Sequence, residues 1–257
     1  MHIDTYGHGA NTSVVLLHGW AMHGGLFKTL AERLARHANV HVVDLPGHGY
    51  SREGEDGFDL ADCVERLSHL LPPSIWVGWS LGGLVALRAA LTPAAQVRGL
   101  GMLCASPCFV SNGAWQHGVA MATLQQFGSD LATDYRGTIE RFLALEALGD
   151  DNAQACLREL QDHVFDRGEP GTAVLEMGLY ALEHTDYRDR LSQLTCPSVW
   201  VPGGRDRLVP WQAMEWAAEA ARGRYHRIAG AAHAPFLTHL AEVTAQIDYL
   251  IREVEAG

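Results

Sequence analysis

The stretch Val77-Gly78-Trp79-Ser80-Leu81-Gly82-Gly83 lies between an apolar run and a helix-like segment. A serine with glycines two positions before and after it is typical of a sharp turn from a strand into a helix, where larger side chains would collide. Such a turn presents the serine hydroxyl and directs the next backbone N–H, that of Leu81, toward the same point. The stretch therefore predicts that Ser80 is a nucleophile and that Leu81 supplies half of an oxyanion hole.

Short apolar runs alternate with helical patterns along much of the chain. The runs, which predict buried strands, cover residues 13–17, 40–43, 75–77, 100–104 and 198–201. Apolar residues at helical spacing cover residues 26–37, 60–71, 84–91 and 211–221. This alternation predicts an α/β fold with a mostly parallel central sheet flanked by helices.

The alternation stops in one long segment, residues 113–187. Only helix-like patterns occur there, with expected breaks at Gly128, Gly149 and residues 168–171. Strand patterns then return, which indicates that the segment interrupts a single sheet. We therefore expect a helical lid, residues 113–187, inserted into a core formed by residues 1–112 and 188–257.

A serine nucleophile needs a general base and an acid that orients the base. Asp206 lies in a glycine-rich loop directly after the predicted strand 198–201, and His233 lies in a loop of small residues before the last helix. Taken singly, Asp206 could be a turn or capping residue and His233 an ordinary loop histidine. Their order after Ser80, each at a strand end, predicts a catalytic triad of Ser80, Asp206 and His233.

The first predicted strand ends in His18-Gly19-Trp20. The end of this strand is where the second oxyanion donor of such a site is expected, so the backbone N–H of Trp20 is our candidate. We expect His18 to brace this loop by hydrogen bonding rather than to act in catalysis. The next loop, residues 44–51, turns on its glycines and is expected to be scaffolding.

The composition excludes several classes of function. A formal net charge of −11 argues against nucleic-acid binding, which requires a basic surface. No apolar run reaches the length of a bilayer, and no cationic segment precedes an apolar one at the N-terminus, so we expect a cytoplasmic protein without a membrane contact. Phosphate-binding glycine loops are missing, and Cys104 and Cys108 lack a second pair of ligands. We therefore expect no cofactor and no metal ion.

Several segments together resemble the α/β-hydrolase superfamily across essentially the whole chain and, within it, the pimeloyl-acyl carrier protein methyl ester esterases. These segments are LLHGW at 16–20, VDLPG at 43–47, GWSLGGLVA at 78–86, ASPCF at 105–109, ERFLAL at 140–145 and AAHAPF at 231–236. The resemblance implies an α/β-hydrolase fold with an inserted lid. It also implies a monomeric serine esterase that removes a methyl group from a pimeloyl chain on acyl carrier protein.

The resemblance further implies a set of substrate contacts. They comprise the oxyanion and triad positions and one lid segment: Trp20, Ser80, Leu81, His233, Phe142, Leu143, Ala144, Leu145 and Glu146. Phe142 and Leu145, on one side of a lid helix, would line a channel for the acyl chain, or would instead pack against the core. Glu146 departs from the family, in which a glutamine is expected at this position.

Docking of the carrier protein is implied for arginines on the lid. Arg141 and Arg158 match that expectation, whereas Gly137 and Gln154 stand where further arginines are expected. Because both partners would be acidic, the basic docking surface would be local. An ordinary solvated surface arginine is the alternative for each position.

Other functions share parts of this pattern. A general short-chain carboxylesterase or thioesterase, acting on small esters, would use the same triad. A carbon–carbon bond hydrolase or a cofactor-free haloperoxidase has a similar fold, but the lid sequence gives neither any support. A haloalkane dehalogenase would need an aspartate in place of Ser80. An inactive hydrolase that serves as a binding module would be expected to lose a triad member, and this chain keeps all three.

Overall fold

A seven-stranded sheet forms the centre of the computed structural model, which describes residues 1–52 and 57–257. The strands are β1 (Ile3–Tyr6), β2 (Ser13–Leu17), β3 (Asn39–Val43), β4 (Ser74–Trp79), β5 (Val97–Leu103), β6 (Ser198–Val201) and β7 (Arg224–Tyr225). Their spatial order is β1-β3-β2-β4-β5-β6-β7. β1 pairs with β3 in antiparallel orientation, and the other neighbouring strands are parallel. The mostly parallel sheet predicted from the sequence is confirmed.

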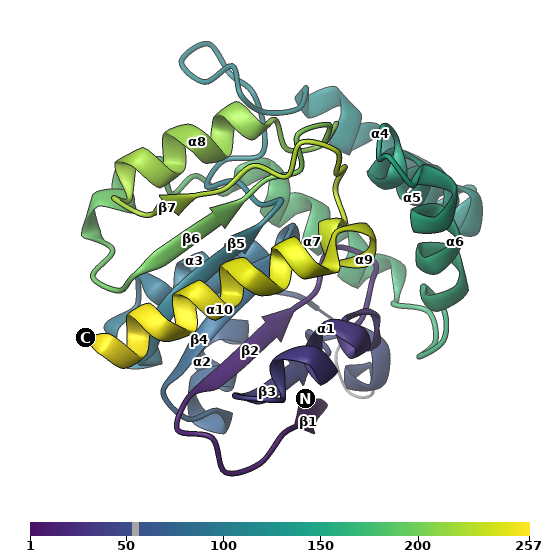
Figure 1. Ribbon diagram of the computed structural model, residues 1–257. Coiled ribbons are helices and arrows are strands. Elements are labelled where there is room, and N and C mark those ends of the chain that lie inside the picture. Colours follow the sequence, from purple (N-terminus) through teal and green to yellow (C-terminus); the bar gives the residue numbers. More distant parts are fainter. Residues whose placement is uncertain (53–56) are drawn as a thin grey trace.

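Helices surround this sheet, some on its two faces and others beyond one end. They are α1 (Lys28–Leu34), α2 (Leu60–Leu70), α3 (Leu81–Ala90), α4 (Met121–Leu131), α5 (Tyr135–Ala147), α6 (Ala153–His163), α7 (Thr172–His184), α8 (Trp211–Ala220), α9 (Pro235–Thr238) and α10 (Leu240–Ala256). In Figure 1, α1 and α10 lie in front of the strands, and α2 and α3 lie behind them. The central strands are thus buried on both faces, which explains their continuous apolar sequences.

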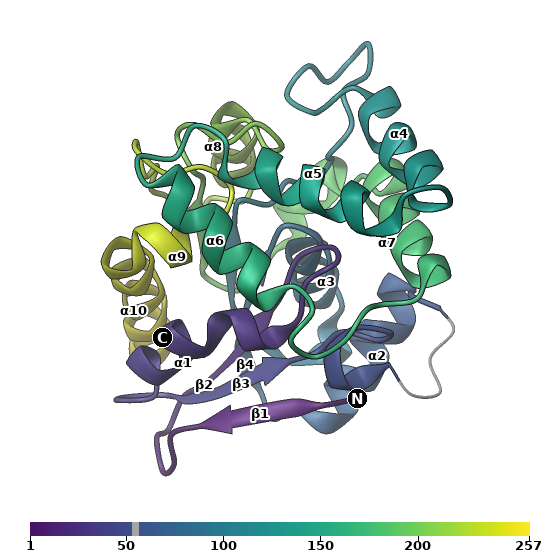
Figure 2. The same cartoon turned by 90° about the vertical axis from the view of Figure 1, so that its right-hand side faces the viewer.

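Four helices, α4 to α7, separate β5 from β6 in the chain. They gather beyond the end of the sheet toward which the parallel strands point (Figures 1 and 2). This is the carboxyl edge, where ligands of open α/β sheets bind. The helices fall within the predicted lid, whose boundaries stay a prediction.

The structure corrects two expectations about the lid. Gly128 lies inside α4 and does not end a helix. A glycine within a helix costs about 1 kcal/mol relative to alanine, which the packing of the helix can offset. The first part of the segment is not helical, because isolated bridges join Val110 to Val119 and Asn112 to Trp115. The other expected breaks lie between helices, and Gly149 has a φ of +97° that favours glycine.

A buried ion pair fastens the lid to the core. Arg167, between α6 and α7, places its guanidinium 3.0 Å from Asp44 Oδ2 and 2.6 Å from Asp4 Oδ2. The Asp44 side chain is fully buried and also accepts hydrogen bonds from the backbone N–H groups of Gly24 and Tyr50. The loop after β3 is therefore held together by one carboxylate.

Arg167→Met is expected to destabilise the protein by about 3–5 kcal/mol, because it leaves the buried Asp44 carboxylate without its cation. Urea unfolding followed by circular dichroism measures the change. Arg136→Met is the matched control, since Arg136 pairs with Glu169 at the surface, where both side chains remain solvated. Equal losses in the two variants would show that burial of the Asp44 pair does not matter.

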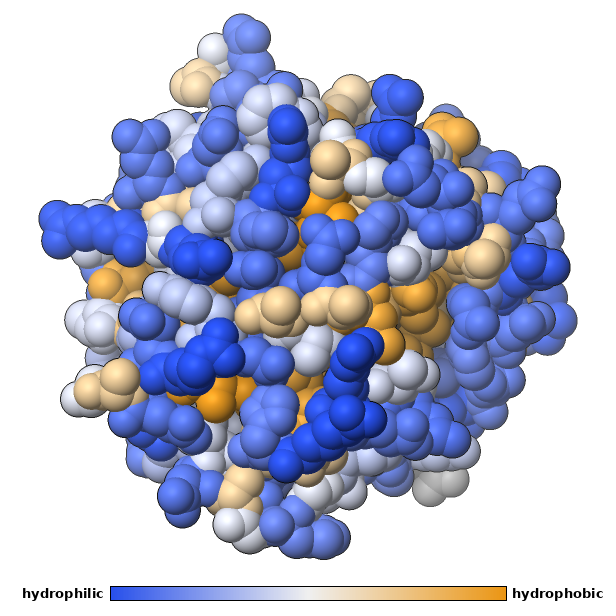
Figure 3. Space-filling model, in the orientation of Figure 1, coloured by the Kyte–Doolittle hydropathy of each residue, from blue (hydrophilic) through white to orange (hydrophobic). Residues whose placement is uncertain are grey.

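The visible surface is predominantly hydrophilic. The face seen in Figure 3 shows apolar residues only as small separate patches between hydrophilic ones. Within the described residues, none of the helices combines the length and the apolar character needed to cross a membrane.

Candidate functional site

The turn after β4 has the backbone geometry that its glycines predict. Ser80 has φ +54° and ψ −120°, a conformation that residues with side chains rarely adopt. A Cβ atom on Gly78 would lie 2.2 Å from the carbonyl oxygen of Gly82, and one on Gly82 would lie 2.3 Å from that of Leu17. Only glycine therefore fits at these two positions, where β4 enters α3. The strained serine stands at the carboxyl edge of the sheet, below the lid.

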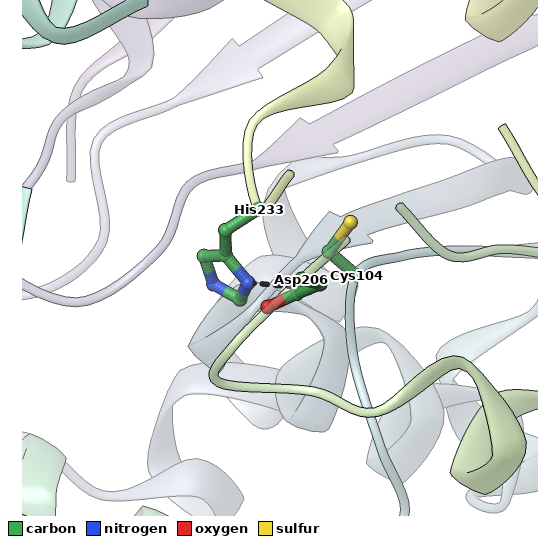
Figure 4. A group of neighbouring side chains, drawn as sticks. All are labelled: Cys104, Asp206 and His233. Carbon is green, nitrogen blue, oxygen red and sulfur yellow. Dashed lines mark hydrogen bonds and ion pairs between the residues drawn. The ribbon is translucent and has the colours of Figure 1, made fainter. Parts of the chain in front are cut away.

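His233 and Asp206 form a buried pair on neighbouring loops (Figure 4). His233 Nδ1 lies 2.7 Å from Asp206 Oδ2. The other carboxylate oxygen, Oδ1, accepts the backbone N–H groups of Leu208 and Val209 at 2.8 and 3.0 Å. The carboxylate is therefore fixed on both sides. Because an ionised carboxylate only accepts hydrogen bonds, the proton of a neutral His233 sits on Nδ1 and leaves Nε2 as an acceptor.

The free nitrogen of His233 is the atom that a general base would use. His233 Nε2 is buried and has no hydrogen-bond partner among the described residues. Burial by itself lowers the pKa of His233, but the charge and hydrogen bond of Asp206 outweigh it, so the pKa is raised above 6.5. Glu146 adds to this rise. The pair thus favours the imidazolium that forms when the base takes a proton.

Backbone bonds hold the His233 loop in place. The indole N–H of Trp79 donates to the carbonyl of His233 at 2.7 Å, which ties the loop to the residue before Ser80. The backbone N–H of His233 donates to the carbonyl of Glu146 at 3.1 Å. Asp150 Oδ2 accepts the backbone N–H of Ala232 at 2.9 Å. No sequence pattern predicts these three supports, because each joins segments far apart in the chain.

Cys104 lies next to the His233–Asp206 pair (Figure 4). Its thiol accepts the backbone N–H of Gly203 at 3.2 Å and donates to the carbonyl of Ala232 at 3.5 Å. The sulfur of Cys104, a carboxylate oxygen of Asp206 and a ring nitrogen of His233 all lie within 4.8 Å of one another. Burial raises the pKa of the Cys104 thiol well above its usual value. The neutral thiol links the loops that carry the acid and the base.

Two observations bear on the expected oxyanion donors, the backbone N–H groups of Trp20 and Leu81, whose role stays a prediction. A Cβ atom on Gly19 would lie 3.2 Å from Cβ of Ser80, so the residue before Trp20 approaches the serine closely. Neither the N–H of Trp20 nor that of Leu81 has a backbone acceptor in the described part of the chain. His18 holds this loop: its Nδ1 bonds the carbonyl of Gly19 at 2.8 Å, and its Nε2 accepts the N–H of Leu45 at 2.9 Å. The expected bracing by hydrogen bonds is confirmed.

The side chain of Trp20 joins the core to the lid. Its indole N–H donates to the carbonyl of Leu175 in α7 at 2.8 Å. Its ring packs edge-on against Phe142 of α5, with ring centroids 4.8 Å apart. Phe127 of α4 contacts both rings. Three lid helices thus converge on the residue that would supply an oxyanion donor.

The remaining lid residues of the predicted substrate site differ in burial. Leu143 and Glu146 are fully buried, Leu145 is partly buried, and Ala144 is exposed. Phe142 and Leu145 both pack against the main hydrophobic core, the alternative that the sequence left open for them. Exposure of Ala144 gives no support to a substrate contact there, and the contacts of the other lid residues stay predictions.

The two lid arginines also differ. The Arg141 guanidinium bonds Asp134, Asp130 and Thr138 at 2.9, 3.2 and 2.9 Å, so its charge is already neutralised on the lid. Arg158 is exposed on α6, and within the described residues it forms no ion pair. Of the two, Arg158 is the better placed to meet an acidic partner.

A surface cavity of about 420 Å³ lies beside α7 and is lined by residues including Arg88, Met177 and Tyr180. The proposed triad does not line it. Ser80 and His233 are instead almost completely covered, with 3% and 1% of their surface exposed. Access for a substrate therefore requires movement of the lid or of the side chains below it.

Known proteins resemble this chain over most of its length. The sequence model of the alpha/beta hydrolase family matches residues 14–246. A pimeloyl-acyl carrier protein methyl ester esterase of Xanthomonas oryzae is 48% identical over 255 residues, which cover 99% of this chain and 100% of the relative. A protein of the same name from Xylella fastidiosa is 46% identical over 254 residues and covers 98% of each chain.

Solved structures share the fold at lower identity. An enol-lactonase from Burkholderia xenovorans has a TM-score of 0.85 at 15% identity, with 98% of this chain and 96% of that chain covered. A hydrolase from Oleispira antarctica has a TM-score of 0.83 at 19% identity, with 97% and 94% covered. These structures support the fold and leave the substrate open.

Proposed function

This chain belongs to the alpha/beta hydrolase family, and from that membership we propose that it is a serine esterase that hydrolyses the methyl ester of a pimeloyl chain carried on acyl carrier protein. Relatives with this name match the chain over its full length, which supports the substrate. One observation carries the chemistry: the bond from His233 to Asp206 leaves Nε2 unpaired on a loop that is tied to the Ser80 turn.

Acylation follows from these positions. His233 Nε2 takes the proton of the Ser80 hydroxyl as its oxygen attacks the ester carbonyl carbon. Negative charge then develops on the carbonyl oxygen, and the N–H groups of Trp20 and Leu81 are its proposed hydrogen-bond donors. Each donor of this kind contributes about 3 kcal/mol to the stability of the transition state. His233 returns its proton to the methoxy oxygen, and methanol leaves an acyl-serine behind.

Deacylation repeats these steps with water. His233 removes a proton from the water as it attacks the acyl-serine, and the collapse of the second tetrahedral intermediate releases Ser80 and a free carboxyl group. The residues of the triad supply every proton transfer, so the mechanism requires no cofactor. The product remains attached to its carrier through the other end of the acyl chain.

The substrate is tested by comparing kcat/KM for pimeloyl-acyl carrier protein methyl ester with kcat/KM for a free short-chain methyl ester. A strong preference for the carrier-linked ester is expected. A preference for the free ester would overturn the carrier-linked substrate and identify a general carboxylesterase. The pairing of Arg141 with acids of its own lid is the observation that favours this second function.

Docking of the carrier protein is proposed for the exposed side of the lid around Arg158. Acyl carrier protein is expected to be acidic, and this chain itself carries a net charge of −11. A single unpaired cation can therefore orient the encounter, although solvent limits its strength. Arg141 is included in the proposed surface. It is expected to contribute less than Arg158 to the binding of the carrier protein, because its charge is neutralised.

Arg158→Glu is expected to raise KM for the carrier-linked ester about fivefold, the equivalent of about 1 kcal/mol for an exposed charge. KM for a free short-chain ester should not change, since the small ester does not reach α6. Steady-state kinetics at low and high salt measure both effects, and salt should reduce the difference.

Arg252→Glu is the control for this prediction. Arg252 is an exposed arginine in α10, and the C-terminal end of this helix lies on the opposite side of the molecule from α6 (Figure 1). The variant has the same net charge as Arg158→Glu, so an equal rise in KM would indicate general repulsion. That result, or an equal change for the free ester, would overturn docking at Arg158. We further propose that the enzyme acts as a monomer in the cytoplasm.

A further inference from the structure

The Glu146 carboxyl group is buried beside the proposed triad without a partner. The residue has 0% of its surface exposed, and neither carboxyl oxygen has a hydrogen-bond partner among the described residues. Its own carbonyl accepts the N–H of His233, so the end of α5 is fixed against the loop of the base. An unpaired buried carboxyl is costly, and a ligand in the site would supply the missing partner.

Titratable groups from several elements interact with Glu146. The charges of His233, before α9, and Asp206, after β6, act on its pKa. Glu146 in turn raises the pKa of two thiols, those of Cys104 after β5 and Cys156 in α6. Burial raises the pKa of both thiols, to about 12 for Cys156, so both are neutral. The charge of Asp206 opposes ionisation of Glu146, and that of a protonated His233 favours it. Burial has the largest effect and raises the pKa of Glu146 to about 8.

We propose that Glu146 is a specificity-determining residue that distinguishes the neutral ester substrate from the carboxylate product. In its protonated form it donates a hydrogen bond to the carboxylate left at Ser80, and in its ionised form it repels that carboxylate. The inference rests on the proposed esterase function, because hydrolysis converts a neutral acyl group into an anion beside this acid.

The physical basis is competition between two carboxyl groups for one proton. Two carboxylates in a desolvated site cannot both ionise without strong repulsion, so one proton is shared between them. A neutral ester carries no charge that Glu146 could repel, so its affinity is independent of whether Glu146 is protonated. A glutamine at this position would also donate a hydrogen bond, but it could not change charge. Glu146 therefore makes retention of the product depend on pH, with release favoured as the acid ionises.

Binding to Ser80→Ala tests this inference, because the variant cannot turn over the ester. The probes are hexanoate and methyl hexanoate, with dissociation constants measured by calorimetry between about pH 7 and about pH 10. If only the protonated form of Glu146 accepts hexanoate, its affinity falls about tenfold per pH unit above the Glu146 pKa. The affinity for methyl hexanoate should stay constant.

Ser80→Ala/Glu146→Gln is the matched control. His233 also loses its proton as pH rises, and Glu146 contributes to the pKa of His233. The comparison is therefore repeated with His233→Gln added to both proteins, and the difference that remains reports Glu146. The double variant should lose the additional fall in hexanoate affinity. An identical pH dependence in both proteins would overturn the proposal, as would an equal weakening of methyl hexanoate.

Proton uptake gives a second readout, and its absence is decisive without a second variant. At about pH 9, hexanoate binding to Ser80→Ala should take up close to one proton, measured in buffers of different ionisation enthalpy. Binding without uptake would overturn the proposal even if the double variant does not fold. Neither probe is linked to a carrier protein. Failure of the carrier-linked substrate would therefore be seen in the kinetic comparison alone and is distinguishable from failure of this inference.

Discussion

Ser80→Ala is expected to reduce kcat for ester hydrolysis by about 10⁶-fold, close to complete loss of turnover, because no other group can form the acyl intermediate. Ser80 donates its backbone N–H to the carbonyl of Leu103, a bond that alanine keeps. Alanine also has the same Cβ as serine and so adopts the strained backbone at similar cost. Hydrolysis of a methyl ester and thermal unfolding of the variant separate the loss of chemistry from any loss of fold.

Ser106→Ala is the control for this prediction. Ser106 is equally buried, and its hydroxyl donates to the carbonyl of Cys108 at 2.7 Å. Its replacement should cost about 1 kcal/mol of stability and leave kcat within a few-fold of the original value. Turnover by Ser80→Ala near that of Ser106→Ala would remove Ser80 as the nucleophile. It would also overturn the proposed acyl-serine mechanism, since the acyl intermediate depends on that oxygen.

Local chemistry explains which parts of the fold could be predicted. The buried parallel strands and the Ser80 turn follow from apolar runs and from the steric demands of Gly78 and Gly82, which act over a few residues. β1 and β7 were not predicted, because they are short edge strands that only pairing with a neighbour defines. The break expected at Gly128 was wrong for the related reason that tertiary packing overrides the weak propensity of one glycine.

The site could be predicted in part, because the chain order of its residues is visible in the sequence but most of its long-range contacts are not. The order of Ser80, Asp206 and His233 at strand ends predicts which residues meet, and the structure joins His233 to Asp206. Their supports, Cys104 and Asp150, come from segments whose sequences carry no sign of the contact. Long-range contacts of this kind arise only when the sheet and the lid assemble.

Charges on the lid depend even more on assembly. Arg141 and Arg158 are alike in sequence, but the fold places Asp130 and Asp134 around the first and leaves the second exposed. Glu146 is a surface-type residue that the end of α5 buries against the His233 loop. A sequence pattern can suggest that such residues are functional, but their charge state follows from burial.

Asp206→Asn is expected to reduce kcat about 10⁴-fold while the protein stays folded. Asparagine can still contact His233 Nδ1, but its amide favours the tautomer that places the imidazole proton on Nε2, where it cannot accept the proton of Ser80. The variant also lacks the negative charge that stabilises the imidazolium. Both effects act on the step in which His233 takes a proton, so kcat should fall more than KM changes.

The dependence of activity on pH should also change in a direction that follows from the pKa of His233. The wild-type base must be neutral, and the pKa of His233 is raised above 6.5 because the charge and hydrogen bond of Asp206 outweigh burial. Activity should therefore rise as pH passes through this raised pKa. In Asp206→Asn that charge no longer opposes the effect of burial, so the pKa of His233 should fall. The acid limb of the pH profile of kcat/KM should therefore move to lower pH. A pH profile between about pH 5 and about pH 9 measures the shift.

Asp151→Asn separates this effect from a general loss of negative charge. Asp151 is exposed and pairs with Arg205, next to Asp206 in the chain. Its replacement removes the same charge at a solvated position, where screening makes its influence on His233 small. The acid limb should stay in place and kcat should be nearly unchanged. If Asp206→Asn left the limb at the wild-type position, Asp206 would not set the pKa of the base, and the 2.7 Å contact with His233 would be structural only.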